Sequence, residues 1–251
     1  TTVTNTQWVG LANYVKAFTG SRDFLNALWF TVKFTVVSVI TINLLSFALA
    51  MLLTRAMKGT NLFRTVFFMP NLIGGIVLGY IWQIIINGFL LRFGVDITFS
   101  AKYGFWGLVV LMNWQLVGYM MVIYIAGIQN ISGELTEAAA IDGASGWQSL
   151  IHVTIPNVMP SITICTFLTL TNSFKLFDQN LALNNGQPYI FQPDGSFIHS
   201  TEMLALNIYN SFYQNANSRG VGQAKAVLFF ILVAAIGLIQ LRYTRKKEVQ
   251  Q

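Results

Sequence analysis

Long uncharged stretches dominate the pattern of hydrophobic and polar positions along this chain. A helix that crosses a bilayer needs about 20 mostly apolar residues. Four stretches have this length: 34–54, 65–91, a part of 104–133, and 153–174. The first of them is expected to begin near Asn26. A fifth stretch, 226–241, reaches this length if residues 223–225 are included. They are continuous and too long for membrane β-strands, so we predict an all-α polytopic membrane protein with five spanning helices.

The composition supports this prediction. Hydrophobic residues make up 54% of the chain and charged residues 10%, whereas a soluble domain carries about 25% charge. The net charge of +6 does not point to nucleic acid, because the basic residues are scattered or lie at the ends of apolar stretches. The single cysteine, Cys165, allows no internal disulfide and is expected to pack within an apolar helix.

Basic residues also orient the predicted spans. Arg55, Lys58 and Arg64 crowd the link after the first span, and loops rich in Lys and Arg lie in the cytoplasm. A second basic run follows the last span, on the same face of a five-span chain: Arg242, Arg245, Lys246 and Lys247. The opposite face carries basic residues that are spread over longer segments: Lys16, Arg22, Arg92, Lys102 and Arg219.

This orientation divides the chain into an outer interfacial segment at 1–25, a transmembrane body at 26–243 and a cytoplasmic tail at 244–251. An outside amino terminus without a signal peptide predicts at least one further transmembrane helix before Thr1. Apolar residues at helical spacing predict short helices near residues 8–18 and 201–214. The second of these falls in a long outer loop, 179–222.

Residues 130–155 form a polar link between the third and fourth spans, on the cytoplasmic side. Ser132 is expected to cap a first short helix and Gly143 to end it. Ser145 and Gln148 fit the capping box of a second helix, and Pro156 opens the next span. A helix pair of this kind favours a partner at the membrane face, and a solvated connector is the alternative.

The same segment resembles the EAA loop of ABC importer permeases. The pattern is Glu-Ala-Ala, then Asp-Gly, then Ile-Pro: Glu137, Ala138, Ala139, Asp142, Gly143, Ile155 and Pro156. In that family the loop forms the coupling helix that docks into a cleft of the ATPase subunit. The resemblance implies that these seven residues transmit ATP-driven closure to the spanning helices.

The resemblance covers the whole chain and is specific to the maltose-type sugar permeases. Several short elements resemble elements of that family: residues 8–14 (WVGLANY), residues 67–70 (FFMP), and Thr201-Glu202 with Tyr209. Residues 177–178 (FD), followed by Leu183, Gly186 and Pro188, resemble a further element. Asn184 and Gln187 depart from its usual Thr and Gly. Such permeases usually have six or more spans, which agrees with a further helix before Thr1.

The resemblance implies a non-enzymatic permease that imports a sugar or oligosaccharide by alternating access, in a bacterial or archaeal cell (inner) membrane. Its expected partners are a second permease, a different chain, two ATPase subunits and an external sugar-binding protein. ATP and Mg²⁺ would bind the ATPases, because this chain has no G-x-x-x-x-G-K-[ST] loop. We expect no cofactor or metal on this chain, since its two histidines, His152 and His199, lie far apart.

Polar residues inside spans are costly and therefore candidate sites. Amides, hydroxyls and aromatic rings match the hydroxyls and apolar faces of a sugar. The candidates for a substrate path lie in the third span and in or just after the fourth: Asn113, Trp114, Gln115, Tyr119, Thr169, Asn172, Lys175 and Asp178. The alternatives are hydrogen bonds between helices and, for Lys175 and Asp178, a local ion pair. Gly75 and Gly79 form a G-x-x-x-G pair that predicts close helix packing within the chain or against a partner.

Two other functions remain open at this point. An ABC permease for glycerol phosphate or a polyamine would share the coupling loop, but an anionic substrate would favour more basic residues along the path than Lys175. A secondary transporter or channel would work without an ATPase and leaves the Glu137–Pro156 pattern unexplained. An intramembrane enzyme would need a nucleophile and base at membrane depth, and no such pair is visible.

Overall fold

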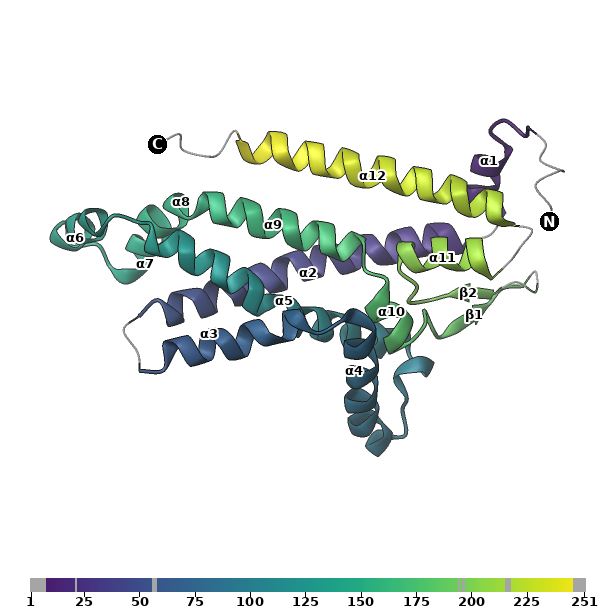
Figure 1. Cartoon of the computed structure of the whole chain (residues 1–251), viewed down its shortest axis with the longest axis horizontal. Helices are drawn as coiled ribbons and strands as arrows, with labels where there is room; N and C mark the ends of the chain where they lie inside the picture. The colour runs from purple at the N-terminus through teal and green to yellow at the C-terminus, as the bar shows by residue number, and fades with distance from the viewer. Residues whose placement is uncertain are drawn as a thin grey trace. The chain divides into compact units, whose positions relative to one another are not determined.

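The computed structural model describes residues 8–20, 22–55, 58–193, 195, 197–214 and 218–245, and nearly all of them are helical (Figure 1). The all-α prediction is confirmed. The chain divides into two compact units: Thr1–Val36, Gly74–Leu111 and Thr171–Ile236 form the first, and Val37–Ile73, Met112–Leu170 and Gly237–Gln251 form the second. Lys246 and Lys247, at the end of the basic run, lie outside the described residues.

Four helices of the described chain are long and apolar enough to cross a membrane. Three of them confirm the first, third and fifth predicted spans: α2 (Asp23–Leu53), α5 (Ala101–Gln129) and α12 (Arg219–Arg245). The fourth, α4 (Gly75–Leu90), is a shorter form of the second predicted span and continues as the 3₁₀ turn η3 (Leu91–Phe93). Lys33, near the start of α2, is exposed, with its ammonium 5.8 Å from the ring of Trp29.

The second predicted span, 65–91, is wrong as a single helix. The structure has α3 (Thr60–Phe68), the 3₁₀ turn η2 (Met69–Leu72) and then α4. Ile73 is extended, with φ −84° and ψ 131°, and the following N-cap, Gly74, is also extended. Pro70 has no N–H for a helical hydrogen bond and its ring clashes with the preceding turn, which accounts for the break.

The fourth predicted span, 153–174, is also interrupted. Its first part belongs to a bent segment that contains α7 (Gly146–Ser149), a π-helical turn η5 (Leu150–Thr154) and α8 (Ile155–Asn157). Val158 leaves the helix, and α9 (Met159–Phe174) continues at 69° to the segment before it. Pro156 and Pro160 each lack a backbone N–H, and each ring clashes with the carbonyl four residues earlier, which accounts for the bend between α8 and α9. With this bent pair the number of candidate spans reaches five, as predicted.

The first unit is built around the starts of α2 and α12. Phe24 and Ala27 of α2 pack on Leu204 of α11 (Leu204–Tyr213), with Leu228 and Leu232 of α12 against them. Figure 1 shows α11 beside the first turns of α12. The helix predicted at 201–214 is thus confirmed, and the one predicted at 8–18 forms only from Ala12, as α1 (Ala12–Thr19).

The loop before α11 contains structure that the sequence analysis missed. After α10 (Asp178–Leu183), strands β1 (Tyr189–Phe191) and β2 (Phe197–His199) form an antiparallel hairpin, with Ile190 opposite Ile198. A further 3₁₀ turn, η4 (Ile97–Phe99), precedes α5. The strands have three residues each, too few for an alternating pattern to stand out in a turn-rich stretch.

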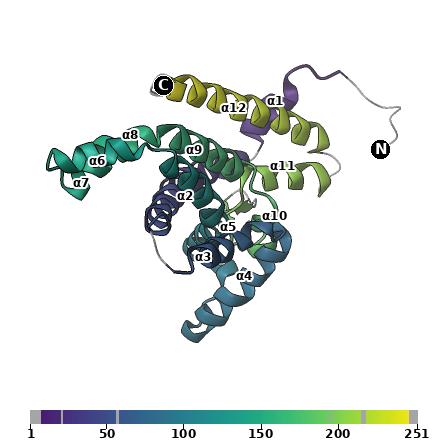
Figure 2. The same cartoon turned by 60° about the vertical axis from the view of Figure 1, so that its left-hand side comes forward.

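The second unit packs the later part of α2 on α5. Ser46 donates a hydrogen bond of 2.9 Å to the carbonyl of Val117, and the Tyr124 hydroxyl donates one of 2.6 Å to Asn43. Cys165 of α9 is buried, as predicted, near the carbonyl of Met120. The short helices α6 (Gly133–Ile141), α7 and α8 lie together at the start of α9 (Figure 2).

Candidate functional site

Helix α6 has the ends that the sequence predicts. The Ser132 hydroxyl accepts a hydrogen bond of 3.3 Å from the backbone N–H of Glu134. At the other end Gly143 is left-handed, with φ 74°, and the N–H of Ala144 donates to the carbonyl of Ala139 over 2.9 Å. This is the glycine-terminated helix end that satisfies the last carbonyls. The predicted cap and stop of the first short helix are confirmed.

Helix α7 begins with the predicted capping box. The Ser145 hydroxyl accepts from the N–H of Gln148 over 3.3 Å, and the Gln148 side chain accepts from the N–H of Ser145 over 2.8 Å. The Gly143 turn and the Ser145 cap together fix a sharp reversal between α6 and α7. The segment is therefore a defined two-helix element, although its surface is largely exposed.

The seven expected coupling residues lie on this element and just after it. Glu137, Ala138, Asp142 and Gly143 are exposed, whereas Ala139 is half-buried. The last two, Ile155 and Pro156, are half-buried in α8.

Sequence reasoning missed two apolar side chains on the same element. Ile141 is 85% exposed and Trp147 is 70% exposed, at the end of α6 and the start of α7. A large apolar residue on a short polar helix was the signal that could have found them. Exposed apolar groups ringed by polar ones are typical of a surface that another protein covers.

Two of the predicted path residues line one pocket, and both come from α5. Asn113 and Trp114 face a pocket of about 520 Å³ whose other walls are apolar, among them Leu45, Phe67 and Pro70. The Asn113 amide donates a hydrogen bond of 3.0 Å to the Thr41 hydroxyl, which orients it. Amide and indole therefore provide the polar groups of an otherwise apolar cavity.

The other predicted path residues are not brought to this pocket's lining. Gln115 is buried, with its amide 3.5 Å from the carbonyl of Ile73, and Tyr119 lies beside the ring of Phe68. The Thr169 hydroxyl donates to the carbonyl of Cys165 in its own helix, over 2.8 Å. These contacts are typical of helix packing.

Asn172, Lys175 and Asp178 belong to the first unit and are exposed. The predicted ion pair between Lys175 and Asp178 is wrong for the described chain. Helix α9 ends at Phe174 and α10 begins at Asp178, so the two charges do not share a helical face.

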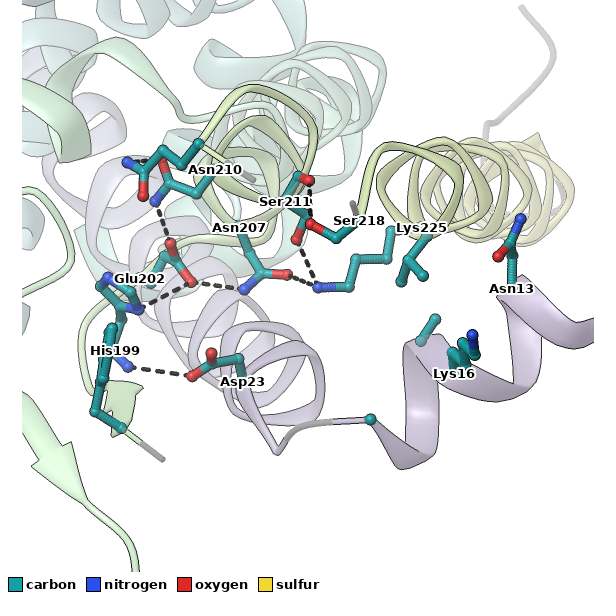
Figure 3. A pocket seen from close by; sticks show the side chains of 15 residues that line it. Asn13, Lys16, Asp23, His199, Glu202, Asn207, Asn210, Ser211, Ser218 and Lys225 are labelled. Atoms are coloured by element: carbon teal, nitrogen blue, oxygen red, sulfur yellow. Dashed lines mark hydrogen bonds and ion pairs between the residues drawn. The ribbon is translucent and has the colours of Figure 1, made fainter. Parts of the chain in front are cut away.

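A second pocket, with mostly polar side chains in its lining, lies in the first unit, between α1, the start of α2, β2, α11 and the start of α12 (Figure 3). We call it the α11–α12 pocket; its volume is about 710 Å³. Its central group is Glu202, which is 1% exposed. Asn210 donates a hydrogen bond of 2.6 Å to one carboxylate oxygen and Asn207 donates one of 2.7 Å to the other.

Lys225 of α12 reaches the same pocket from the opposite wall. Its ammonium donates to the Asn207 side-chain oxygen over 2.9 Å and to the Ser211 hydroxyl over 2.7 Å, so Asn207 bridges Lys225 and Glu202. In the same pocket, Asp23 of α2 accepts a hydrogen bond of 3.3 Å from the backbone N–H of His199. Figure 3 shows these groups as one connected network.

Burial raises the pKa of the Glu202 carboxyl above its ordinary range. His199, whose ring nitrogen lies 3.9 Å from the carboxylate, and the two asparagine amides act in the opposite direction, and Asp23 adds to the rise. Sequence reasoning placed Glu202 in a family element but did not find its partners. The sequence around Lys225 indicates only the edge of the last span.

Comparison with known proteins gives consistent matches over this architecture. A family model described as "Binding-protein-dependent transport system inner membrane component" matches residues 58–248. The probable starch degradation products transport system permease protein AmyD of Thermoanaerobacterium thermosulfurigenes is 42% identical over 97% of this chain and 82% of its own length. The trehalose/maltose transport system permease protein MalF of Thermococcus litoralis is 28% identical over 95% of this chain and 80% of its own length.

A solved structure has the same fold. A chain in the crystal structure of a bacterial ABC transporter involved in the import of the acidic polysaccharide alginate superposes with a TM-score of 0.80 and 20% identity. The match covers 96% of the present chain and 85% of that one.

Proposed function

Because this chain belongs to the family of binding-protein-dependent transport system inner membrane components, we propose that it is the membrane-spanning subunit of an ATP-driven importer for a sugar or oligosaccharide. It is not an enzyme, and the ATPase of such a system is a separate subunit. The observation that carries the proposal is the exposed two-helix element of α6 and α7, with Gly143 in the left-handed conformation and the side chains of Ile141 and Trp147 exposed.

The proposed substrate is an oligosaccharide derived from starch. The relative with 42% identity is named for starch degradation products, and another with 28% identity is named for trehalose and maltose. The groups at the α5 pocket agree with this, because Asn113 and Trp114 offer an uncharged amide and an indole. Hydrogen bonds from the amide and contact with the ring would match a sugar's hydroxyls and its apolar face.

A phosphorylated substrate is the second candidate. A relative from Agrobacterium fabrum, at 28% identity over 97% of this chain and 83% of its own length, is named an sn-glycerol-3-phosphate transport system permease protein. An anion of that kind would favour basic groups in the pocket. No Lys or Arg is among the described residues that line the α5 pocket, which favours the neutral sugar.

The proposed assembly follows from the coupling element. In it, α6 docks into an ATPase subunit on the cytoplasmic side, with Glu137, Ala138, Ala139, Asp142 and Gly143 at the contact. Ile155 and Pro156 begin the connection from this element to α9. ATP-driven movement of α6 would be transmitted through that connection to the α5 pocket, which would give alternating access. A second permease, two ATPases that hold ATP and Mg²⁺, and an external sugar-binding protein complete the transporter.

A pull-down from native membranes in mild detergent tests the proposal. Wild type is expected to bring down an ATPase and a second permease, and Glu137→Arg and Ile141→Arg are expected to lose the ATPase. Lys175→Glu is the matched control, since it reverses an exposed charge far from the α6–α7 element in the sequence and should keep both partners. Recovery of the chain without any ATPase, under conditions that preserve other complexes, would contradict the importer assignment.

A further inference from the structure

The α11–α12 pocket is not explained by the coupling element or by the α5 pocket. Its walls come from α1, from the first turns of α2 and α12, and from the hairpin and helix between α10 and α12. Glu202, Asn207 and Lys225 are buried at its floor, whereas Lys16 and Gln214 are exposed at its edge. The volume of about 710 Å³ lies within the range of small-molecule sites, roughly 300–1,000 Å³.

The charges in the pocket balance. Lys16 and Lys225 line the pocket together with Asp23 and Glu202, and His199 lies beside Glu202. A phosphate or carboxylate would meet two carboxylates, and an amine would meet two ammonium groups. The lining therefore favours a ligand without net charge.

The hydrogen-bonding groups are held in fixed directions and retain capacity for a ligand. Lys225 carries three N–H donors and uses two, on Asn207 and Ser211. Asp23 accepts the His199 N–H with one oxygen, and its second oxygen has no partner in the described residues. Gln214 donates to Asn210 with its amide nitrogen, which leaves its carbonyl oxygen at the edge of the pocket. The cavity thus offers both a donor, Lys225, and acceptors, Asp23 and Gln214, which suits hydroxyl groups because each hydroxyl can donate and accept.

One aromatic ring completes the lining. Phe197 is 47% exposed and stands edge-on to Tyr189 and His199, with ring centroids 5.2 Å and 5.5 Å away. These two neighbours hold the ring in place while leaving part of it uncovered. An apolar C–H face of a ligand would contact it without costly ordering of the side chain.

We propose that the α11–α12 pocket binds one neutral sugar ring, as a site separate from the α5 pocket at Asn113 and Trp114. The inference rests on the proposed function and assigns a second carbohydrate contact to the same chain. Asp23, Lys225 and Gln214 bond the hydroxyls, and Phe197 contacts the apolar face. The buried bridge of Glu202, Asn207 and Lys225 keeps the floor rigid before the sugar arrives.

Photoaffinity labelling of the intact transporter tests this proposal. The complex is purified without maltoside detergents, whose head groups are themselves sugars, and placed in nanodiscs of phosphatidylethanolamine and phosphatidylglycerol. A maltotrioside with a diazirine group is cross-linked, and the labelled peptides are mapped. We expect label within residues 8–20 and 197–214, and we expect excess maltotriose, but not inorganic phosphate, to remove it.

Matched variants assign the label to the pocket. Gln214→Trp places a large ring at its edge, and Phe197→Ala removes the aromatic wall; both side chains are partly exposed, and each variant is expected to reduce labelling at least about fivefold, equivalent to roughly 1 kcal/mol. Leu11→Trp adds the same ring at an exposed position outside the pocket and should label as wild type does. Labelling that is equal in Gln214→Trp, Phe197→Ala and wild type would overturn the proposal.

Two further arms separate the other outcomes. Nanodiscs that contain glucosyl diacylglycerol test whether the sugar in the pocket comes from a lipid head group. If this lipid prevents the labelling and free maltotriose does not, the pocket binds a lipid head group, and the proposed substrate site is overturned. ATP-dependent uptake of maltotriose into proteoliposomes is measured in parallel. Uptake without label in the pocket would overturn this inference alone, whereas loss of both would also contradict the proposed sugar importer.

Discussion

Gly79 of α4 lies directly against Ala182 of α10: a Cβ atom at position 79 would be 2.6 Å from the Cβ of Ala182. Gly75, one turn earlier, faces Asp178 in the same way, with a corresponding distance of 2.7 Å. The G-x-x-x-G pair thus serves packing within this chain, one of the two alternatives that the sequence leaves open. Without side chains at 75 and 79, the two helices approach to backbone contact.

Replacing Gly79 by Ala should therefore destabilise the first unit. The added methyl cannot fit without a shift of α10, and overpacking of this kind costs about 1–3 kcal/mol. Gly88→Ala is the control in the same helix, because a Cβ there meets nothing within 4 Å. Thermal unfolding in detergent should show a lower midpoint for Gly79→Ala only, and Ala182→Gly should restore it. Equal midpoints for the two single variants would refute the close contact.

The turn after α6 makes a second prediction. Gly143 has φ 74°, and nothing lies within 4 Å of a Cβ there, so Gly143→Ala introduces backbone strain of about 1–2 kcal/mol without a clash. Gly146→Ala, in equally open space but without positive φ, is the control. We expect lower ATP-dependent uptake for Gly143→Ala at equal protein level, measured in proteoliposomes. Uptake that is unchanged in both variants would show that the turn geometry does not matter for coupling.

The raised pKa of Glu202 predicts a pH dependence of stability. The folded state holds the Glu202 proton more tightly than the unfolded state, whose pKa is near 4.5, so the free energy of unfolding falls as pH rises from 4.5 through the folded-state pKa. Asp23, His199 and Lys225 are the titratable groups around it. Melting temperatures across this range should decline less steeply in Glu202→Gln than in wild type.

The slope is the readout of that experiment, since Glu202→Gln also weakens the hydrogen bonds from Asn207 and Asn210 at every pH. Glu134→Gln, at an exposed carboxylate of α6, is the control and should keep the wild-type slope. Parallel pH profiles for wild type and Glu202→Gln would contradict the raised pKa.

The sequence predicts the parts of this protein that depend on local signals. Helices α2, α5 and α12 follow from apolar length alone, and the ends of α6 and α7 follow from Ser132, Gly143 and Ser145. The breaks at Ile73, after Pro70, and at Val158, between Pro156 and Pro160, do not follow from apolar length and composition, because an apolar stretch that contains a proline still meets both criteria. The prolines themselves were visible, and a stricter use of their missing N–H would have found both breaks.

The α11–α12 pocket could not be predicted for a different reason. Glu202 and Lys225 meet through Asn207, and Asp23 joins them from nearly the other end of the chain. Nothing in the local sequence around each residue indicates these partners, because the contacts exist only after α11 has packed between α2 and α12. The same limit explains the candidate path: eight polar residues were proposed, and packing brings only Asn113 and Trp114 to the α5 pocket.

Substitutions in the α5 pocket test whether those two residues contact the substrate. Asn113→Ala removes an amide that lines the cavity, and a hydrogen bond of about 0.5–1.5 kcal/mol lost from the bound sugar would raise the KM for maltotriose uptake roughly two- to tenfold. Trp114→Ala should raise KM with little effect on stability, since Trp114 is partly exposed.

Asn43→Ala is the matched control for Asn113→Ala. Asn43 is also an amide in a spanning helix, but it accepts the Tyr124 hydroxyl and does not line the α5 pocket. Its loss leaves a buried hydroxyl without that acceptor, so we expect a lower melting temperature with an unchanged KM. If Asn113→Ala and Trp114→Ala also lower only the melting temperature, their polar groups serve helix packing. In that case the sugar does not pass through the α5 pocket.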